Sequence, residues 1–289
     1  MANDIEHSHY YVPERTWWPI MGSVGLTALV AGFSYTLNGG DGKWVMLVGA
    51  LALAAMLVGW FGQVIHESES RAYSGWEDRT FRLGMSWFIF SEVMFFGAFF
   101  GALFYARVLA VPWLGGLGEG AQTHQWLWDS FQAVWPTNGP QKLGGTFEPV
   151  PAWGLPALNT LILLSSAGAV TWAHHALKRG NRRNLILGLS CTVLLGFLFV
   201  ILQGKEYLHA HTELNLSLGS GIYGSTFFML TGFHGLHVTL GAVMLSVILL
   251  RALRGHFTPE HHFAFEAAAW YWHFVDVVWL FLFIFVYWL

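Results

Sequence analysis

The sequence carries little charge and a single cysteine. Only 11% of its 289 residues are Asp, Glu, Lys or Arg, whereas soluble domains carry about 25%. Because Cys191 stands alone, no disulfide can form within the chain, and the sequence has neither a CxxCH haem-attachment motif nor a cysteine pair for a thiolate metal site. The formal net charge of −3 offers no basic surface for nucleic acid.

Apolar and aromatic residues take the place of charge. Hydrophobic residues make up 55% of the chain, which contains 16 Trp and 24 Phe. This composition is typical of an integral membrane protein with aromatic belts at both water–lipid interfaces. The first 16 residues are polar and lack a basic region, so we expect no secretory signal.

Seven apolar segments are long enough to cross a bilayer, which needs about 20 residues of helix. The sequence therefore predicts an all-α membrane protein with seven transmembrane helices. The segments are roughly Trp17–Leu37, Trp44–Ile65, Leu83–Ala106, Trp153–Ala173, Leu185–Leu202, Ile222–Leu250 and Ala267–Leu289. Residues 107–151 are rich in Gly, Pro and Trp, and we expect them to form an ordered loop on the membrane surface.

The basic residues predict the orientation of these segments. Loops on the cytoplasmic side carry an excess of Lys and Arg. With the N-terminus inside, ten basic residues lie inside and four outside, which predicts a cytoplasmic N-terminus and an external C-terminus. The inner set is Arg15, Arg71, Arg79, Arg82, Lys178, Arg179, Arg182, Arg183, Arg251 and Arg254, and the outer set is Lys43, Arg107, Lys142 and Lys205.

The segment Leu83–Ala106 contains one charged residue, Glu92, close to the middle of the bilayer. A carboxylate there costs several kcal/mol unless it is protonated or paired, so Glu92 is a candidate functional residue. We expect a neutral carboxyl that forms a hydrogen bond with His234 or His237, and the sequence does not choose between them. Gly97 and Gly101 form a GxxxG pattern, which predicts that another helix packs closely on this one.

Four histidine and aspartate residues also lie inside the apolar segments. His234 and His237 share a helix face and could hold haem or a binuclear metal. A di-iron site needs several carboxylates with Glu-x-x-His repeats, and no such repeat lies inside the apolar segments, so we expect hydrogen-bonded core histidines and no metal. His273 and Asp276 favour structural hydrogen bonding over a proton relay. Glu206 and Glu266 are expected at helix ends, in the interface.

Charged residues collect at the predicted cytoplasmic edge. Glu67, Arg82 and Arg251 belong to this set, and guanidinium groups at that depth suit lipid phosphates. Ordinary topology-setting charge is the alternative interpretation.

Four strings carry a resemblance to a known family. They are RLGMSWFIFSEVMFFGAFF (82–100), LNTLILLSSAGAVTWAHHAL (158–177), YGSTFFMLTGFHGLHV (223–238) and HHFAFEAAAWYWHFVDVVWLFLF (261–283). They resemble subunit III of cytochrome c oxidase, of the bacterial aa3 type, and the match covers nearly the whole chain. Two N-terminal spans favour this type over the related quinol oxidases, whose third subunits typically have five spans.

The resemblance implies an architecture and a set of partners. It implies two bundles, helices 1–2 and helices 3–7, with a lipid-filled V-shaped cleft, so that residues 1–66 hold the first bundle, 67–82 a polar link and 83–289 the second bundle. It further implies bound phospholipid, with haem A and copper confined to partner subunits I and II, and cytochrome c as substrate of the complex.

The resemblance also implies roles for single residues. Glu92 falls on the family's carbodiimide-reactive carboxyl, and Glu67 and Arg251 fall on positions associated with cleft lipids. The link SESRAYSG and the long loop 107–151 depart from mitochondrial members, so lipid contacts of the link and contacts of the loop are not carried over.

The resulting prediction is a non-redox core subunit without catalytic residues in an oxidase of the bacterial inner membrane. It would stabilise subunit I, hold lipid, and support proton uptake. The alternatives are subunit III of a quinol oxidase, or a free-standing transporter or channel that uses Glu92 and Asp276.

Overall fold

The computed structural model describes residues 11, 15–70, 72–73, 75–118 and 121–289. Seven helices in these residues are long and apolar enough to cross a membrane, and no strand occurs among them. The prediction of an all-α protein with seven spanning helices is confirmed. Arg71, one of the residues counted for the orientation, lies outside the described residues.

The helices follow one another along the chain with short connections, except between α5 and α6. They are α1 (Trp18–Leu37), α2 (Lys43–Glu69), α3 (Gly75–Phe104), the π-helical η1 (Tyr105–Ala110), α4 (Val111–Leu114), α5 (Ala121–Leu127), α6 (Leu155–Lys178), α7 (Arg182–Thr212), α8 (Gly221–Arg254), α9 (Phe263–Leu282) and the π-helical η3 (Phe283–Trp288).

Several helices extend beyond the apolar segments that predict them. The run from Gly75 to Leu114 is continuously helical, and α7 continues ten residues past Leu202 to Thr212. Most of the predicted polar link, 67–82, is helical too. Charged residues end an apolar run but do not end a helix, because Lys, Arg and Glu are good helix formers.

Local sequence signals set several helix ends. Proline lies in the first turn of α1 and of α6, where its missing N–H costs nothing. The side chain of Asn181 accepts a hydrogen bond from the backbone N–H of Asn184 and caps α7. Gly255 ends α8 with φ of 80°, a conformation that L-residues other than Gly and Asn rarely adopt.

The chain divides into two compact units, residues 1–83 and 84–289. In the first unit α1 and α2 pack closely because glycines face each other across the contact. A Cβ atom added to Gly32 would lie 2.7 Å from the backbone nitrogen of Met46, and one added to Gly49 would lie 2.5 Å from that of Leu29. Such close approach is how helices associate in lipid.

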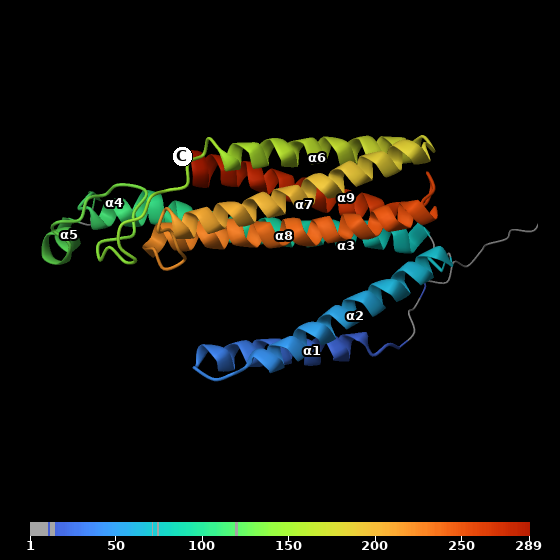
Figure 1. Ribbon diagram of the computed structural model, residues 1–289, viewed down its shortest axis with the longest axis horizontal. Coiled ribbons are helices and arrows are strands. Elements are labelled where there is room, and N and C mark those ends of the chain that lie inside the picture. Colours follow the sequence, from blue (N-terminus) through green and yellow to red (C-terminus); the bar gives the residue numbers. More distant parts are fainter. Residues whose placement is uncertain (1–10, 12–14, 71, 74, 119–120) are drawn as a thin grey trace, which may run out of the picture. The chain divides into compact units, whose positions relative to one another are not determined.

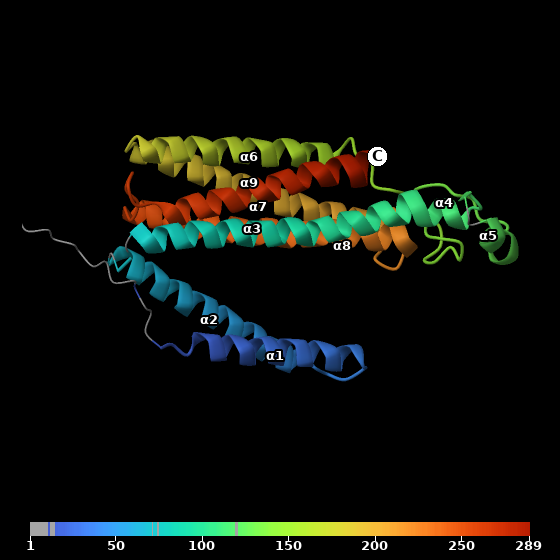
Figure 2. The same ribbon diagram turned by 180° about the vertical axis from the view of Figure 1, so that it is seen from behind.

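In the second unit α6, α7, α8 and α9 run side by side, with the rest of α3 along α8 (Figures 1 and 2). Aromatic side chains join α3 to its neighbours, since the rings of Phe95 and Phe233 are 5.0 Å apart. The predicted close packing at Gly97 and Gly101 is wrong within this chain, because an added Cβ at either glycine would meet no atom within 4 Å. The face of α3 that carries these glycines is open.

The segment between α3 and α6 is partly helical and is anchored to the turn between α7 and α8. Asn215 donates a hydrogen bond of 2.7 Å to the carbonyl of Thr146, and the backbone N–H of Tyr223 donates to that of Thr137. The ring of Phe147 stacks on that of Tyr223 with centroids 5.4 Å apart. These contacts tie the described part of the segment to its own chain.

Trp272 of α9 lies at the centre of the second unit and is completely buried. Its indole occupies a space left by Gly196 of α7 and Gly241 of α8, and its N–H donates a 2.9 Å hydrogen bond to the hydroxyl of Ser166 in α6. One side chain therefore contacts three neighbouring helices.

We expect Gly196→Ala to destabilise the second unit by about 1–3 kcal/mol, because its new Cβ would lie 2.7 Å from the rigid Trp272 ring. Gly204→Ala, on the same helix, is the control, since a Cβ there meets nothing within 4 Å. Thermal unfolding of the purified protein measures both. Equal midpoints for the two variants would contradict this account of the core.

Candidate functional site

Glu92 of α3 forms its contact with His237 of α8. Oε2 of the carboxyl lies 2.8 Å from Nε2 of the imidazole, and the two side chains are 20% and 12% exposed. The rings of Phe95 and Phe96 lie beside the imidazole, with centroids 5.9 and 5.1 Å away. Of the two predicted candidates, His237 and not His234 is therefore the partner of Glu92.

The second nitrogen of His237 fixes how the pair holds its proton. Nδ1 lies 2.6 Å from the carbonyl oxygen of Phe233, which can only accept, so Nδ1 carries a hydrogen. Nε2 then either accepts from a protonated Glu92 or, in the imidazolium, donates to a carboxylate. Both arrangements contain the same number of protons, so the pair has no net charge in either one. A neutral pair removes most of the cost of placing a carboxyl in a membrane.

His234 forms a different contact from the same helix. Its Nε2 donates a 3.0 Å hydrogen bond to the carbonyl of Val275 in α9, and the side chain is completely buried. The imidazole lies between the rings of Phe199 and Trp279, with centroid distances of 5.7 and 5.2 Å. His234 is therefore a core histidine that joins α8 to α9.

His273 and Asp276 do not pair as a relay would require. The hydroxyl of Thr171 donates to the carbonyl of Ala167, so Nε2 of His273 donates to that hydroxyl at 3.2 Å and joins α9 to α6. Asp276 is buried, and its Oδ1 accepts no hydrogen bond from the described residues. The predicted structural bond is present for His273, while none is formed by this oxygen of Asp276.

Glu67, a candidate lipid contact, is held inside the first unit. Its two oxygens accept hydrogen bonds from Tyr73 at 2.7 Å and from Gln63 at 2.9 Å, and Gln63 in turn accepts from the indole of Trp18. Burial and the bond to the Glu67 carboxyl raise the pKa of the Tyr73 phenol well above 10. The Tyr73 phenol therefore keeps its proton, and can donate it to Glu67, through neutral and moderately alkaline pH.

The two arginines assigned to lipid also contact their own chain. The Nε of Arg82 donates to Asp78 at 2.8 Å, one helical turn away, and both side chains are partly exposed. Arg251 is only 7% exposed, and its guanidinium lies 4.8 Å from the centre of the Phe257 ring. Its position in the last turn of α8 suits a cation.

Two buried carboxyls were missed by the sequence analysis, which expects both in the interface. Glu206 is buried, and its Oε1 accepts hydrogen bonds from the hydroxyl of Tyr287 at 2.6 Å and from Gln203 at 3.1 Å. Glu266 is also buried, next to His174 and His262. Helix α7 continues through the charged stretch that contains Glu206, and α9 begins before Glu266. Both carboxyls therefore lie within a helix, beyond the end of the apolar segment that predicts it.

These features define a polytopic membrane protein in which several buried polar groups form hydrogen bonds between helices. The family model for "Cytochrome c oxidase subunit III" matches residues 7–289. Proteins named cytochrome c oxidase subunit 3 from Gadus morhua and Marchantia polymorpha are each 41% identical to the chain, over 280 and 284 residues. The protein of that name from Oryctolagus cuniculus is 38% identical, and in all three cases 96% of both chains is covered.

The chain belongs to the cytochrome c oxidase subunit III family. This family is the subunit of the oxidase without a redox centre of its own, and it works as part of an oxidoreductase complex with other oxidase subunits. The resemblance of the four sequence strings to subunit III of cytochrome c oxidase is confirmed.

We expect Glu92→Gln to be nearly silent, because the amide N–H can donate to Nε2 of His237 and keep the bond. Glu92→Leu leaves that buried nitrogen without a partner and should cost about 1–3 kcal/mol. The midpoint of thermal unfolding, measured on both variants and the wild type, tests this. Wild-type stability in Glu92→Leu would show that the contact contributes nothing.

Proposed function

We propose that this chain is the third subunit of an aa3-type oxidase that passes electrons from cytochrome c to oxygen and pumps protons. Subunits I and II would hold haem A and copper, and subunit I would form the main contact. The observation that carries the proposal is sequence identity of 38–41% to proteins named cytochrome c oxidase subunit 3, across 96% of both chains.

We assign Glu92 a structural role rather than a step in proton transfer. The pair with His237 is complete within this chain, and His234 and His273 bond to partners of their own. No hydrogen-bonded chain among the described residues links these groups to one another. Support of proton uptake would then act through the stability of subunit I and not through a relay in this chain.

We place the protein in a bacterial inner membrane with a cytoplasmic N-terminus and a periplasmic C-terminus. The excess of basic residues on the side of the N-terminus supports this orientation. The bacterial assignment follows the resemblance of the four sequence strings to the bacterial aa3 type.

Two alternative functions would require features that differ from those of this chain. A quinol oxidase would share the fold, but its third subunit typically lacks the first two spans, which this chain has as α1 and α2. A free-standing transporter would use Glu92 and Asp276 along one path, and no hydrogen bond connects them in the described residues.

We expect a tagged chain, purified from its native membrane in mild detergent, to co-purify with partner subunits that contain haem A and stoichiometric copper. The haem A is then visible in the optical spectrum of the complex. The reason is that partner subunits hold these groups, whereas the chain released from the complex should bind no haem, copper or iron. Reduced-minus-oxidised spectra and elemental analysis test both statements. Isolation of the chain alone, or haem that remains on the released chain, would contradict the proposal.

We also propose that the chain holds structural phospholipid through Glu67, Arg82 and Arg251, as the resemblance implies. All three lie near helix ends, where lipid head groups occur. A guanidinium matches a phosphate with two parallel hydrogen bonds, so the two arginines are stronger candidates than Glu67. The Nε of Arg82 is bonded to Asp78, so Arg251 is the residue chosen for the test.

We expect Arg251→Ala to lose about one phospholipid per complex, because the phosphate would lose its planar cation. Arg254→Ala, which removes an exposed arginine from the same helix, is the matched control and should keep the wild-type lipid. Native mass spectrometry counts the bound lipids. A full lipid complement in Arg251→Ala would exclude Arg251 as a ligand.

A further inference from the structure

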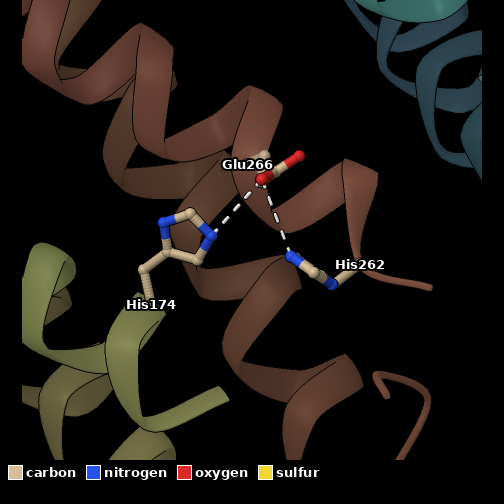
Figure 3. Close-up of side chains that lie close together, drawn as sticks. All are labelled: His174, His262 and Glu266. Atoms are coloured by element: carbon tan, nitrogen blue, oxygen red, sulfur yellow. Dashed lines mark ion pairs between the residues drawn. The ribbon is translucent and has the colours of Figure 1, made fainter. Parts of the chain in front are cut away.

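Three side chains that the proposed function does not use converge at one end of the second unit. His174 comes from the last turns of α6, while His262 and Glu266 lie four residues apart at the start of α9. Figure 3 shows both imidazoles directed at the same carboxylate oxygen. The three ligand atoms lie within 4.8 Å of one another.

The distances in this cluster are too long for hydrogen bonds of ordinary strength. Nε2 of His174 is 3.4 Å and Nε2 of His262 is 3.6 Å from Oε1 of Glu266, whereas N–H···O bonds measure about 2.7–3.2 Å. Neither nitrogen has a hydrogen-bond partner among the described residues, although both are shielded from solvent. Two buried nitrogen atoms therefore lie within ion-pair distance of a carboxylate without forming a hydrogen bond to it.

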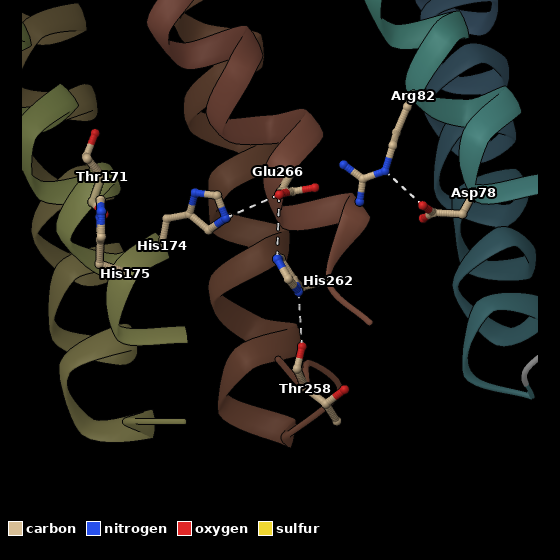
Figure 4. A network of polar contacts seen from close by, with 8 residues as sticks. All are labelled: Asp78, Arg82, Thr171, His174, His175, Thr258, His262 and Glu266. Carbon is tan, nitrogen blue, oxygen red and sulfur yellow. Dashed lines mark hydrogen bonds and ion pairs between the residues drawn. The ribbon is translucent and has the colours of Figure 1, made fainter. Parts of the chain in front are cut away.

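A backbone contact sets the orientation of His262. Its Nδ1 lies 3.2 Å from the carbonyl oxygen of Thr258 and therefore carries the hydrogen (Figure 4). In the neutral imidazole, Nε2 then presents a lone pair to Glu266. Histidines that bind a metal through one ring nitrogen usually donate a hydrogen bond from the other nitrogen to a carbonyl or carboxylate, as His262 does here.

The spacing fits a metal ion. Zinc binds imidazole nitrogen and carboxylate oxygen at about 2.0–2.2 Å, so neighbouring ligands of a tetrahedral ion lie roughly 3.3–3.5 Å apart. The distances of 3.4 and 3.6 Å from Glu266 to the two histidines are close to that value. Two histidines and one glutamate form a known zinc ligand set that leaves a fourth position for water.

We infer that His174, His262 and Glu266 form a binding site for a divalent transition-metal ion, with zinc the best fit to the ligand set. Only one ligand is anionic, and Lys178 lies one turn beyond His174 on the same helix face. Both features weaken the attraction for a cation, so binding is reversible and weaker than in a closed structural zinc site. The sequence predicts no metal because no cysteine pair occurs and no Glu-x-x-His repeat lies in the apolar segments. It gives no sign of this cluster, since His174 is distant from the other two ligands along the chain.

The test counts zinc in the purified oxidase complex that contains this chain. Complexes are incubated with Zn²⁺ alone, freed of excess ion and analysed for zinc per complex. We expect the wild type to retain about one zinc more than His174→Ala or His262→Ala. Equal zinc in the wild type and both variants would overturn the site.

Neighbouring histidines supply matched controls. His175→Ala and His261→Ala each remove an exposed imidazole next to a ligand, and both should retain zinc as the wild type does. Loss of zinc in these variants to the same extent as in the ligand variants would point to general disruption and overturn the assignment. Glu266→Gln preserves the shape of the side chain, removes its charge and should bind less zinc than the wild type.

If a ligand variant does not assemble into the complex, X-ray absorption at the zinc edge of the wild-type complex tests whether histidines bind the zinc. We expect back-scattering from imidazole rings, with nitrogen and oxygen neighbours at about 2.0–2.2 Å. A zinc environment without imidazole would overturn the inference.

Discussion

The second unit depends on the burial of Trp272 among four helices. Its indole requires glycine on α7 and on α8, and its N–H requires an acceptor on α6, which Ser166 supplies. In lipid, helices gain little from excluding apolar surface, so close packing and interhelical hydrogen bonds determine which faces meet. An indole in this position provides both, because it fills a space shaped by Gly196 and Gly241 and closes one polar bond.

The same constraint explains the other buried polar groups. A polar atom in the hydrocarbon region cannot bond to water, so it bonds to another helix or remains costly. His234 bonds to a backbone carbonyl of α9, His273 to a threonine of α6, and Glu92 to His237. Each bond fixes one pair of helices, which suits a subunit whose family carries no redox centre.

Helix α3 differs from the other helices of the second unit. It contacts them through large aromatic side chains and one polar pair, and the face with Gly97 and Gly101 is open. The GxxxG pattern shows that a close approach is possible, but it does not say which helix approaches or whether that helix belongs to the same chain. For this reason the prediction that another helix packs closely at these glycines fails within this chain.

The sequence by itself determined the membrane class, the seven spans and the family, because hydropathy, length and long strings of residues are properties of the linear chain. It could also rank Glu92 as a residue that needs a partner. Only the tertiary structure decided that the partner is His237 and not His234, because two residues three apart on a helix differ by about 60° in direction. It also decided that His174 meets Glu266, since that contact depends on how α6 packs against α9.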